Sequence, residues 1–144
     1  MPLFWDETTG ALHITQDAHL ESHMHRRDVL ALRQALLGDA PAQPPPADGA
    51  VVPMPAFAVP GGRLACLCIL HGDKLHAVEL SVVSVGQRRR GTAEQQRAFL
   101  FQCLRAADPS PDSQRNVLLR CPFGTTLIAT DPRTGDATLR LTYR

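Results

Sequence analysis

The twenty residues TTLIATDPRTGDATLRLTYR, 125–144, contain the pattern that decides the fold. From residue 137 to the end of this stretch, apolar or aromatic side chains alternate with Thr and Arg without interruption. A period of two is typical of a β-strand with one buried face and one solvated face. The preceding segment, DPRTG at 131–135, has Asp, Pro and Gly where a tight reversal needs them. The stretch therefore predicts a β-hairpin, and its apolar face needs a further layer from the rest of the chain.

The length and composition indicate one globular domain over residues 1–144. The chain is long enough to bury a core without disulfides or a metal, and 44% hydrophobic with 20% charged residues is ordinary. A net charge of +1 favours neither nucleic acid nor a membrane surface as a partner. The start, MPLFWDE, lacks the features of a signal peptide, and the longest apolar run, 64–70, is too short to span a bilayer. We therefore expect a cytoplasmic protein whose four cysteines are reduced.

The N-terminal part, 1–37, is predicted to form a hairpin and a helix. Two short apolar segments, LFW and ALHIT, flank the turn DETTG at 6–10, which has the same D-x-x-T-G pattern as 131–135. A helical period follows over 17–37, and Gly38 is placed to end the helix. The apolar spacing is clear only in the C-terminal half, and the polar first half, 18–27, is compatible with a frayed or irregular segment. Residues 38–60 hold seven of the twelve prolines and are predicted to be a linker, although 54–59 is compatible with an edge strand despite Pro55.

The remaining residues, 61–144, are predicted to form the main sheet and a helix. Strands are expected at 63–70 and 75–85, and a helix at 92–107, where Thr92 and Gln95 have the spacing of a capping box. The sequence therefore predicts an α+β fold. It consists of an antiparallel sheet of about five strands with one helix packed on a face, plus the N-terminal hairpin and helix.

The order of these parts resembles a group of small uncharacterised bacterial proteins that end in W-G…Y-D-P-R-x-G. The resemblance covers somewhat over half the chain, and is carried by GDKL at 72–75, by the helix opened by Thr92, by Phe123-Gly124 and by DPRTG at 131–135. It departs at Phe123 and Thr130, where those proteins have Trp and Tyr. It implies the fold and a bacterial origin, and it implies no activity and no site.

Four of the six histidines fall between residues 13 and 25. His19 and His23 are spaced i, i+4, so on a helix they would share one face and reach a common metal ion, with His25 close by. The three histidines are therefore a candidate metal site. The plainer alternative is a solvated start of the helix.

Arg88, Arg89 and Arg90 lie just before the predicted helix N-terminus, where backbone N–H groups and the helix dipole favour an anion. They are a candidate site for phosphate or an acidic peptide, and a solubilising loop is the alternative. Without interleaved aromatic residues they do not indicate nucleic-acid binding. No thiol-enzyme, serine-hydrolase, P-loop or dinucleotide signature is present, so no cofactor and no catalytic residue is predicted.

Phe99 and Phe101 lie on opposite flanks of the apolar stripe of the predicted helix, which makes its apolar face wider than contact with one sheet requires. We therefore predict an interface at these rings, for a partner protein or, if the rings are exposed, for a second copy of the chain. The resulting hypothesis is a non-catalytic binding or interaction protein. The alternative is a small metal- or anion-dependent enzyme that uses the histidines or the arginines.

Overall fold

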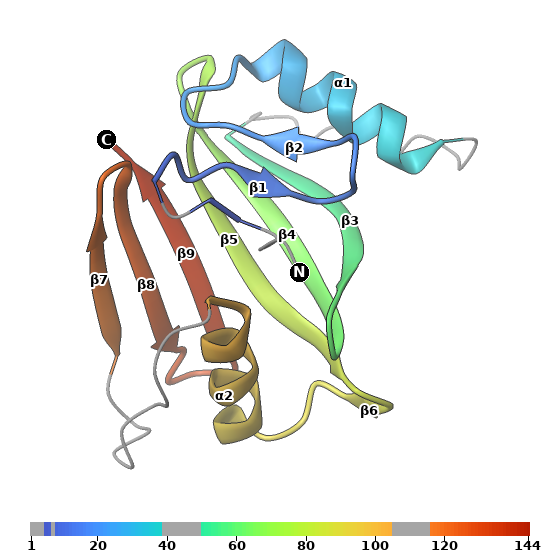
Figure 1. Ribbon diagram of the computed structural model, residues 1–144, viewed down its shortest axis with the longest axis vertical. Helices are drawn as coiled ribbons and strands as arrows, with labels where there is room; N and C mark the ends of the chain where they lie inside the picture. The colour runs from blue at the N-terminus through green and yellow to red at the C-terminus, as the bar shows by residue number, and fades with distance from the viewer. Residues whose placement is uncertain (1–4, 7, 39–49, 105–115) are drawn as a thin grey trace.

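A computed structural model describes residues 5–6, 8–38, 50–104 and 116–144, except the side chains of Arg88 and Leu104. Its main element is an antiparallel sheet with strand order β3-β4-β5-β9-β8-β7, and a short strand β6 pairs with β5 outside this path (Figure 1). The α+β class is confirmed. The strands are β3 (Val51–Val59), β4 (Gly62–His71), β5 (Lys74–Val85), β6 (Arg88–Arg89), β7 (Val117–Cys121), β8 (Gly124–Thr130) and β9 (Ala137–Tyr143).

The inner face of the sheet carries the core. In β9 the side chains of Ala137, Leu139, Leu141 and Tyr143 are all buried, as the alternation predicts. Helix α2 (Ala93–Leu104) packs against β5, β8 and β9, while α1 (Arg26–Leu37) packs against β3 and β5. The two-stranded ladder of β1 (Leu12–His13) and β2 (His19–Leu20) adds its leucines to the same core (Figure 1). In the described part of the chain, no helix is long and apolar enough to cross a membrane.

The two D-x-x-T-G segments form the same turn. Asp6 N–H donates to Ala11 O and Gly10 N–H to Asp6 O, and Asp131 and Gly135 repeat both bonds at their own positions. The aspartate side chain accepts a backbone N–H two residues on in each case. Gly10 and Gly135 both have φ +75°, a conformation that glycine adopts without strain. Both predicted reversals are confirmed.

The predicted number of strands and the predicted linker are corrected. The main path has six strands instead of about five, and β3 extends through residues that were predicted to be linker. Pro53 and Pro55 are accommodated because β3 is an edge strand, where a missing N–H breaks no ladder, and because its register shifts between Met54 and Phe57. Residues 39–49 of the expected linker lie outside the described residues.

The helix expected over 17–37 begins only at Arg26. The preceding segment contains the short strand β2 and a turn instead, because pairing Leu12 with Leu20 buries both side chains completely. His25 has an extended backbone (φ −69°, ψ 146°), and its ring accepts the N–H of Arg27 to cap the helix. The burial of apolar side chains has outweighed local helical spacing here.

The capping box of α2 is present as predicted. Thr92 N–H donates to Gln95 Oε1 at 2.9 Å, and Gln95 N–H donates to Thr92 Oγ1 at 3.2 Å. Residues 105–107, which were expected to complete this helix, lie outside the described residues.

Candidate functional site

The three histidines of the predicted metal site do not share a helix face. His19 lies in β2 with its Nε2 2.6 Å from Glu21 Oε1, His23 lies in a turn with φ +60°, and His25 caps α1. The helical spacing behind the prediction is therefore wrong. Among the residues that the structure describes, no three side chains of His, Cys, Asp or Glu are grouped so that they could hold a metal ion.

The three arginines do not lie in a plain loop ahead of α2. Arg88 and Arg89 form the short strand β6, where their backbones pair with Val85 and Ser84. Arg90 makes an ion pair with Asp136, with 3.3 Å between Nη1 and Oδ2. The expected loop is therefore a short strand, and the charge of Arg90 is already balanced by a carboxylate.

Two of the four thiols, those of Cys66 and Cys103, have raised pKa values that favour the protonated form. The pKa of Cys66 is raised by its hydrogen bond with the Cys68 thiol and by burial, and burial raises the pKa of Cys103 to about 11. Burial also raises the pKa of Tyr143, whose hydroxyl donates to Gly10 O at 2.9 Å. A nucleophilic cysteine needs the opposite shift, so these groups have a structural role in the core.

The two phenylalanines of the predicted interface are buried within a single chain. Phe99 is 4% exposed and Phe101 is 5% exposed. Both rings belong to the core that α2 forms with the sheet. The condition of exposed rings, on which self-association through them depended, is therefore not met. An interface with a partner protein at these rings stays a prediction.

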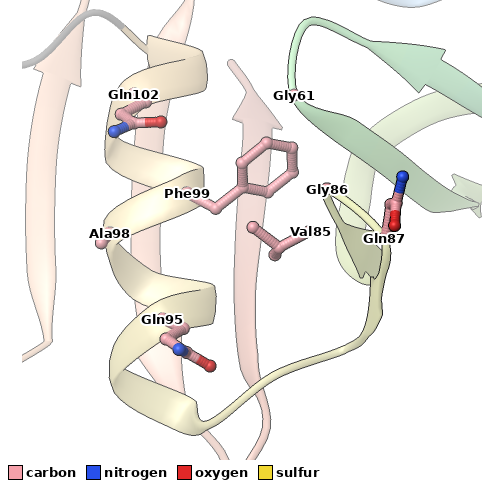
Figure 2. Close-up of a pocket in the computed structure, with 8 residues that line it drawn as sticks. All are labelled: Gly61, Val85, Gly86, Gln87, Gln95, Ala98, Phe99 and Gln102. Carbon is pink, nitrogen blue, oxygen red and sulfur yellow. The ribbon is translucent and has the colours of Figure 1, made fainter.

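The edge of the Phe99 ring nevertheless forms the floor of an open hollow beside α2 (Figure 2). The hollow has a volume of about 580 Å³. One wall is a face of α2, and the other is made by the β3–β4 turn and the β5–β6 turn, which are joined by a 2.7 Å hydrogen bond from Gly86 N–H to Gly61 O. The described residues that line it are Gly61, Val85, Gly86, Gln87, Gln95, Ala98, Phe99 and Gln102.

Glycine makes the close approach of the β3–β4 turn to the helix possible. A Cβ on Gly62 would lie 2.8 Å from Phe99 Cζ and 2.3 Å from Ser84 O, which leaves no room for a side chain. A Cβ on Gly61 would be 3.5 Å from the Phe99 ring, which is an ordinary contact, but the φ of +89° at this position would strain any residue with a side chain. The ring is thus packed beneath the turn on one side and faces the hollow on the other.

None of the eight lining residues has an ionisable side chain. Gln87, Gln95 and Gln102 supply carboxamides, which both donate and accept hydrogen bonds, although the Gln95 oxygen already accepts Thr92 N–H. Val85, Ala98 and Phe99 supply apolar surface. The hollow can therefore hold an uncharged group that combines apolar and amide character. It offers no acid, base or nucleophile from these residues.

Helix α2 is fixed in position by the buried side chain of Gln96. Its Nε2 donates to Asp136 Oδ1 at 3.1 Å and to Gly91 O at 3.3 Å, and its Oε1 accepts Ala137 N–H at 2.9 Å. These bonds tie the first turn of the helix to the start of β9. The anchor therefore fixes the helix that carries two of the lining glutamines, Gln95 and Gln102.

Sequence reasoning identified Phe99 but missed the rest of the hollow. Gln95, Ala98, Phe99 and Gln102 have the i, i+3, i+4, i+7 spacing of one helix face, which is a readable signal. The opposite wall comes from two turns that meet only in the folded chain. Comparison of the chain with protein-family models, with curated proteins and with solved structures gives no match.

Proposed function

We propose that the protein is a non-catalytic interaction protein of the bacterial cytoplasm, which holds an uncharged segment of a partner protein in the hollow beside α2. The observation that carries this proposal is the composition of the walls: three carboxamides around an apolar floor, without an ionisable side chain among the eight lining residues. The volume of about 580 Å³ is in the range of small-ligand and side-chain pockets.

The chemistry of the walls determines the class of segment. A charged group that left water for this hollow would lose hydration without gaining an opposite charge from the lining residues, which is costly. A peptide group would instead find carboxamides to pair with its N–H and C=O, and a neighbouring leucine-sized side chain would find apolar surface for its methyl groups. An uncharged, amide-bearing segment of a polypeptide therefore fits best.

The state of the titratable core residues supports a role without catalysis. The pKa shifts of Cys66, Cys103 and Tyr143 all favour the protonated form, so none of them is activated for attack or proton abstraction at neutral pH. The alternative, an enzyme that depends on a metal or an anion, has no supporting observation among the described histidines and arginines.

Nuclear magnetic resonance titration tests the proposal with defined probes. N-acetyl-leucine amide, which is uncharged, should shift the side-chain amide signals of Gln87, Gln95 and Gln102. Free leucine, a zwitterion of the same side chain, should shift them much less. Gln34 is exposed on α1 and provides an internal control whose signal should not move.

A variant that fills the hollow completes the test. Ala98→Trp should abolish the shifts caused by N-acetyl-leucine amide, whereas Ala31→Trp, at an exposed position of α1, should leave them unchanged. Equal responses to the neutral and the zwitterionic probe, or shifts that persist in Ala98→Trp, would contradict the proposal.

A further inference from the structure

The two outer strands of the sheet differ in how their free edges are protected. In β3, Pro53 and Pro55 remove two backbone donors, and the register shifts between Met54 and Phe57. The carbonyl of Pro53 accepts a hydrogen bond from Arg33 Nε at 2.9 Å. Prolines, bulges and covered carbonyls are the usual means of preventing an edge strand from pairing with another chain. The β3 edge is therefore blocked.

Within the described residues, the β7 edge has none of these protections. Its sequence, VLLRC, contains neither proline nor lysine, and its register with β8 runs without a shift from Val117 to Cys121. Leu118 is 56% exposed and Leu119 is 36% exposed, on opposite faces of the strand. Among the described residues, β7 pairs with β8 alone, and it forms the outer margin of the sheet (Figure 1). A regular, apolar, unprotected edge is a template for a further strand.

The hairpin geometry shows which backbone groups the edge presents. Cys121 pairs with Gly124 across a two-residue loop, and the closing pair of such a hairpin exchanges backbone hydrogen bonds. Hydrogen-bonded residues alternate along an antiparallel strand, so Leu119 also bonds to β8. The backbone N–H and C=O groups of Leu118 and Arg120 are therefore directed toward the open edge.

We infer that β7 is a self-association site at which it pairs, antiparallel, with β7 of a second copy of this chain. With Leu118 opposite Leu118 at the centre, Val117 lies opposite Leu119 of the other copy. Arg120, the one charged residue of the strand, lies opposite Asn116, a neutral amide. In this register the two copies of Arg120 are about 13 Å apart along the strands, from a rise of about 3.3 Å per residue. Apolar residues thus meet apolar residues, and like charges stay apart.

The same arrangement closes at two copies. Pairing uses the open edge of both chains and leaves a blocked β3 edge at each end of the joined sheet. A two-fold contact of this kind cannot propagate into a fibre. The net charge of +1 per chain gives little repulsion between the copies. The site involves none of the residues that line the hollow, so it stands independently of the proposed function.

Sedimentation velocity on the untagged full chain, over low to high micromolar concentrations, tests the inference. We expect a monomer–dimer equilibrium in the micromolar range, because a single strand pair is a small interface. Leu118→Lys places two like charges opposite each other and should raise the dissociation constant by about tenfold or more. Leu67→Lys is the matched control: Leu67 is 37% exposed on the same face but lies in β4, so the equilibrium should not change.

Amide hydrogen exchange identifies the edge itself. The amides of Leu118 and Arg120 should become protected as the concentration rises, while the Leu119 amide should be protected at every concentration. Circular dichroism establishes that both lysine variants are folded. A wild-type chain that stays monomeric at high micromolar concentration would overturn the inference. So would a dimer that Leu118→Lys leaves intact, or one that forms without a change in protection at Leu118 and Arg120.

Discussion

Gly10 and Gly135 occupy the same position of the same turn with the same φ of +75°, and they differ in what surrounds them. A Cβ on Gly10 would lie 2.7 Å from Phe123 Cγ and from Tyr143 Cε1, whereas a Cβ on Gly135 would meet nothing within 4 Å. The first turn is packed on the aromatic residues of the C-terminal hairpin, and the second turn is free of such contact.

Alanine substitutions at Gly135 and Gly10 distinguish the stability cost of backbone strain from the cost of overpacking. Gly135→Ala should lower the free energy of unfolding by about 1 kcal/mol, the usual cost of a left-handed non-glycine residue. Gly10→Ala should carry that cost and about 1–3 kcal/mol more, because the added methyl group overpacks the two rings. Urea denaturation of both variants measures the difference. Equal losses of stability would show that the rings yield to the methyl group.

A second prediction at this scale concerns the buried thiol of Cys103. Its pKa is about 11 in the folded protein, from 9.0 for an unperturbed thiol. The unfolded chain therefore loses this proton first as the pH rises, so the free energy of unfolding falls between pH 9 and about 11. Below pH 9 both states keep the proton and the contribution is constant.

Denaturation of wild type and Cys103→Ala at several alkaline pH values measures this effect. In that window the free energy of unfolding should fall with pH more steeply in the wild type than in the variant. The difference should reach up to about 1.4 kcal/mol per pH unit, the value for one proton. Tyr143 and Cys66, whose pKa values are also raised, are present in both proteins and contribute the same pH dependence to each. The same slope in both proteins would mean that the Cys103 thiol is as well solvated in the folded chain as in the unfolded chain.

At the scale of elements, the position of α2 depends on Gln96. Gln96→Leu preserves the approximate volume of the side chain but leaves Ala137 N–H and Gly91 O without their partner on the helix. Each of these two groups costs about 1–3 kcal/mol when it loses its hydrogen bond, so we expect a loss of about 2–6 kcal/mol in total. Gln102→Leu, on an exposed position of the same helix, should change stability by less than about 0.5 kcal/mol. Thermal or urea denaturation measures both, and similar losses would contradict the anchoring role of Gln96.

The elements that the sequence predicts well are those that local chemistry determines. The two D-x-x-T-G turns and the capping box of Thr92 and Gln95 are completed by residues a few positions apart, so their signals are contained in short segments. The alternation of β9 is equally local. These features could be predicted because no distant contact competes with them.

The elements that sequence reasoning missed are set by distant contacts. The short strand β2 replaces the expected start of the helix because Leu20 reaches the core beside Leu12. The edge strand allowed at 54–59 begins earlier, at Val51, because β4 supplies a partner for it. The candidate site behaves in the same way. Phe99 is visible in the helix pattern, but Gly61 and Gly86 join it only through a hydrogen bond between two turns.

At the scale of the whole molecule, the two ends of the sheet have opposite properties, and together they limit assembly. A sheet with one open edge pairs once, and a sheet with two open edges can pair repeatedly. The blocked edge depends on Pro53, Pro55 and the Arg33 side chain over the Pro53 carbonyl. These three residues should therefore determine whether the assembly stops at two chains.

The combined variant Arg33→Met, Pro53→Thr and Pro55→Thr tests this dependence. Methionine keeps the apolar stem of Arg33 on β3 while exposing the carbonyl, and threonine restores the two missing donors in a residue suited to strands. We expect light scattering to show assemblies larger than two chains, growing with concentration, because each dimer now has an open edge at both ends. Adding Leu118→Lys to this variant disfavours pairing at the β7 edge, so only the opened β3 edge can pair and the assemblies should shrink to two chains at most. A combined variant that remains a dimer, with its fold verified by circular dichroism, would show that the β3 edge is blocked by something other than these three residues.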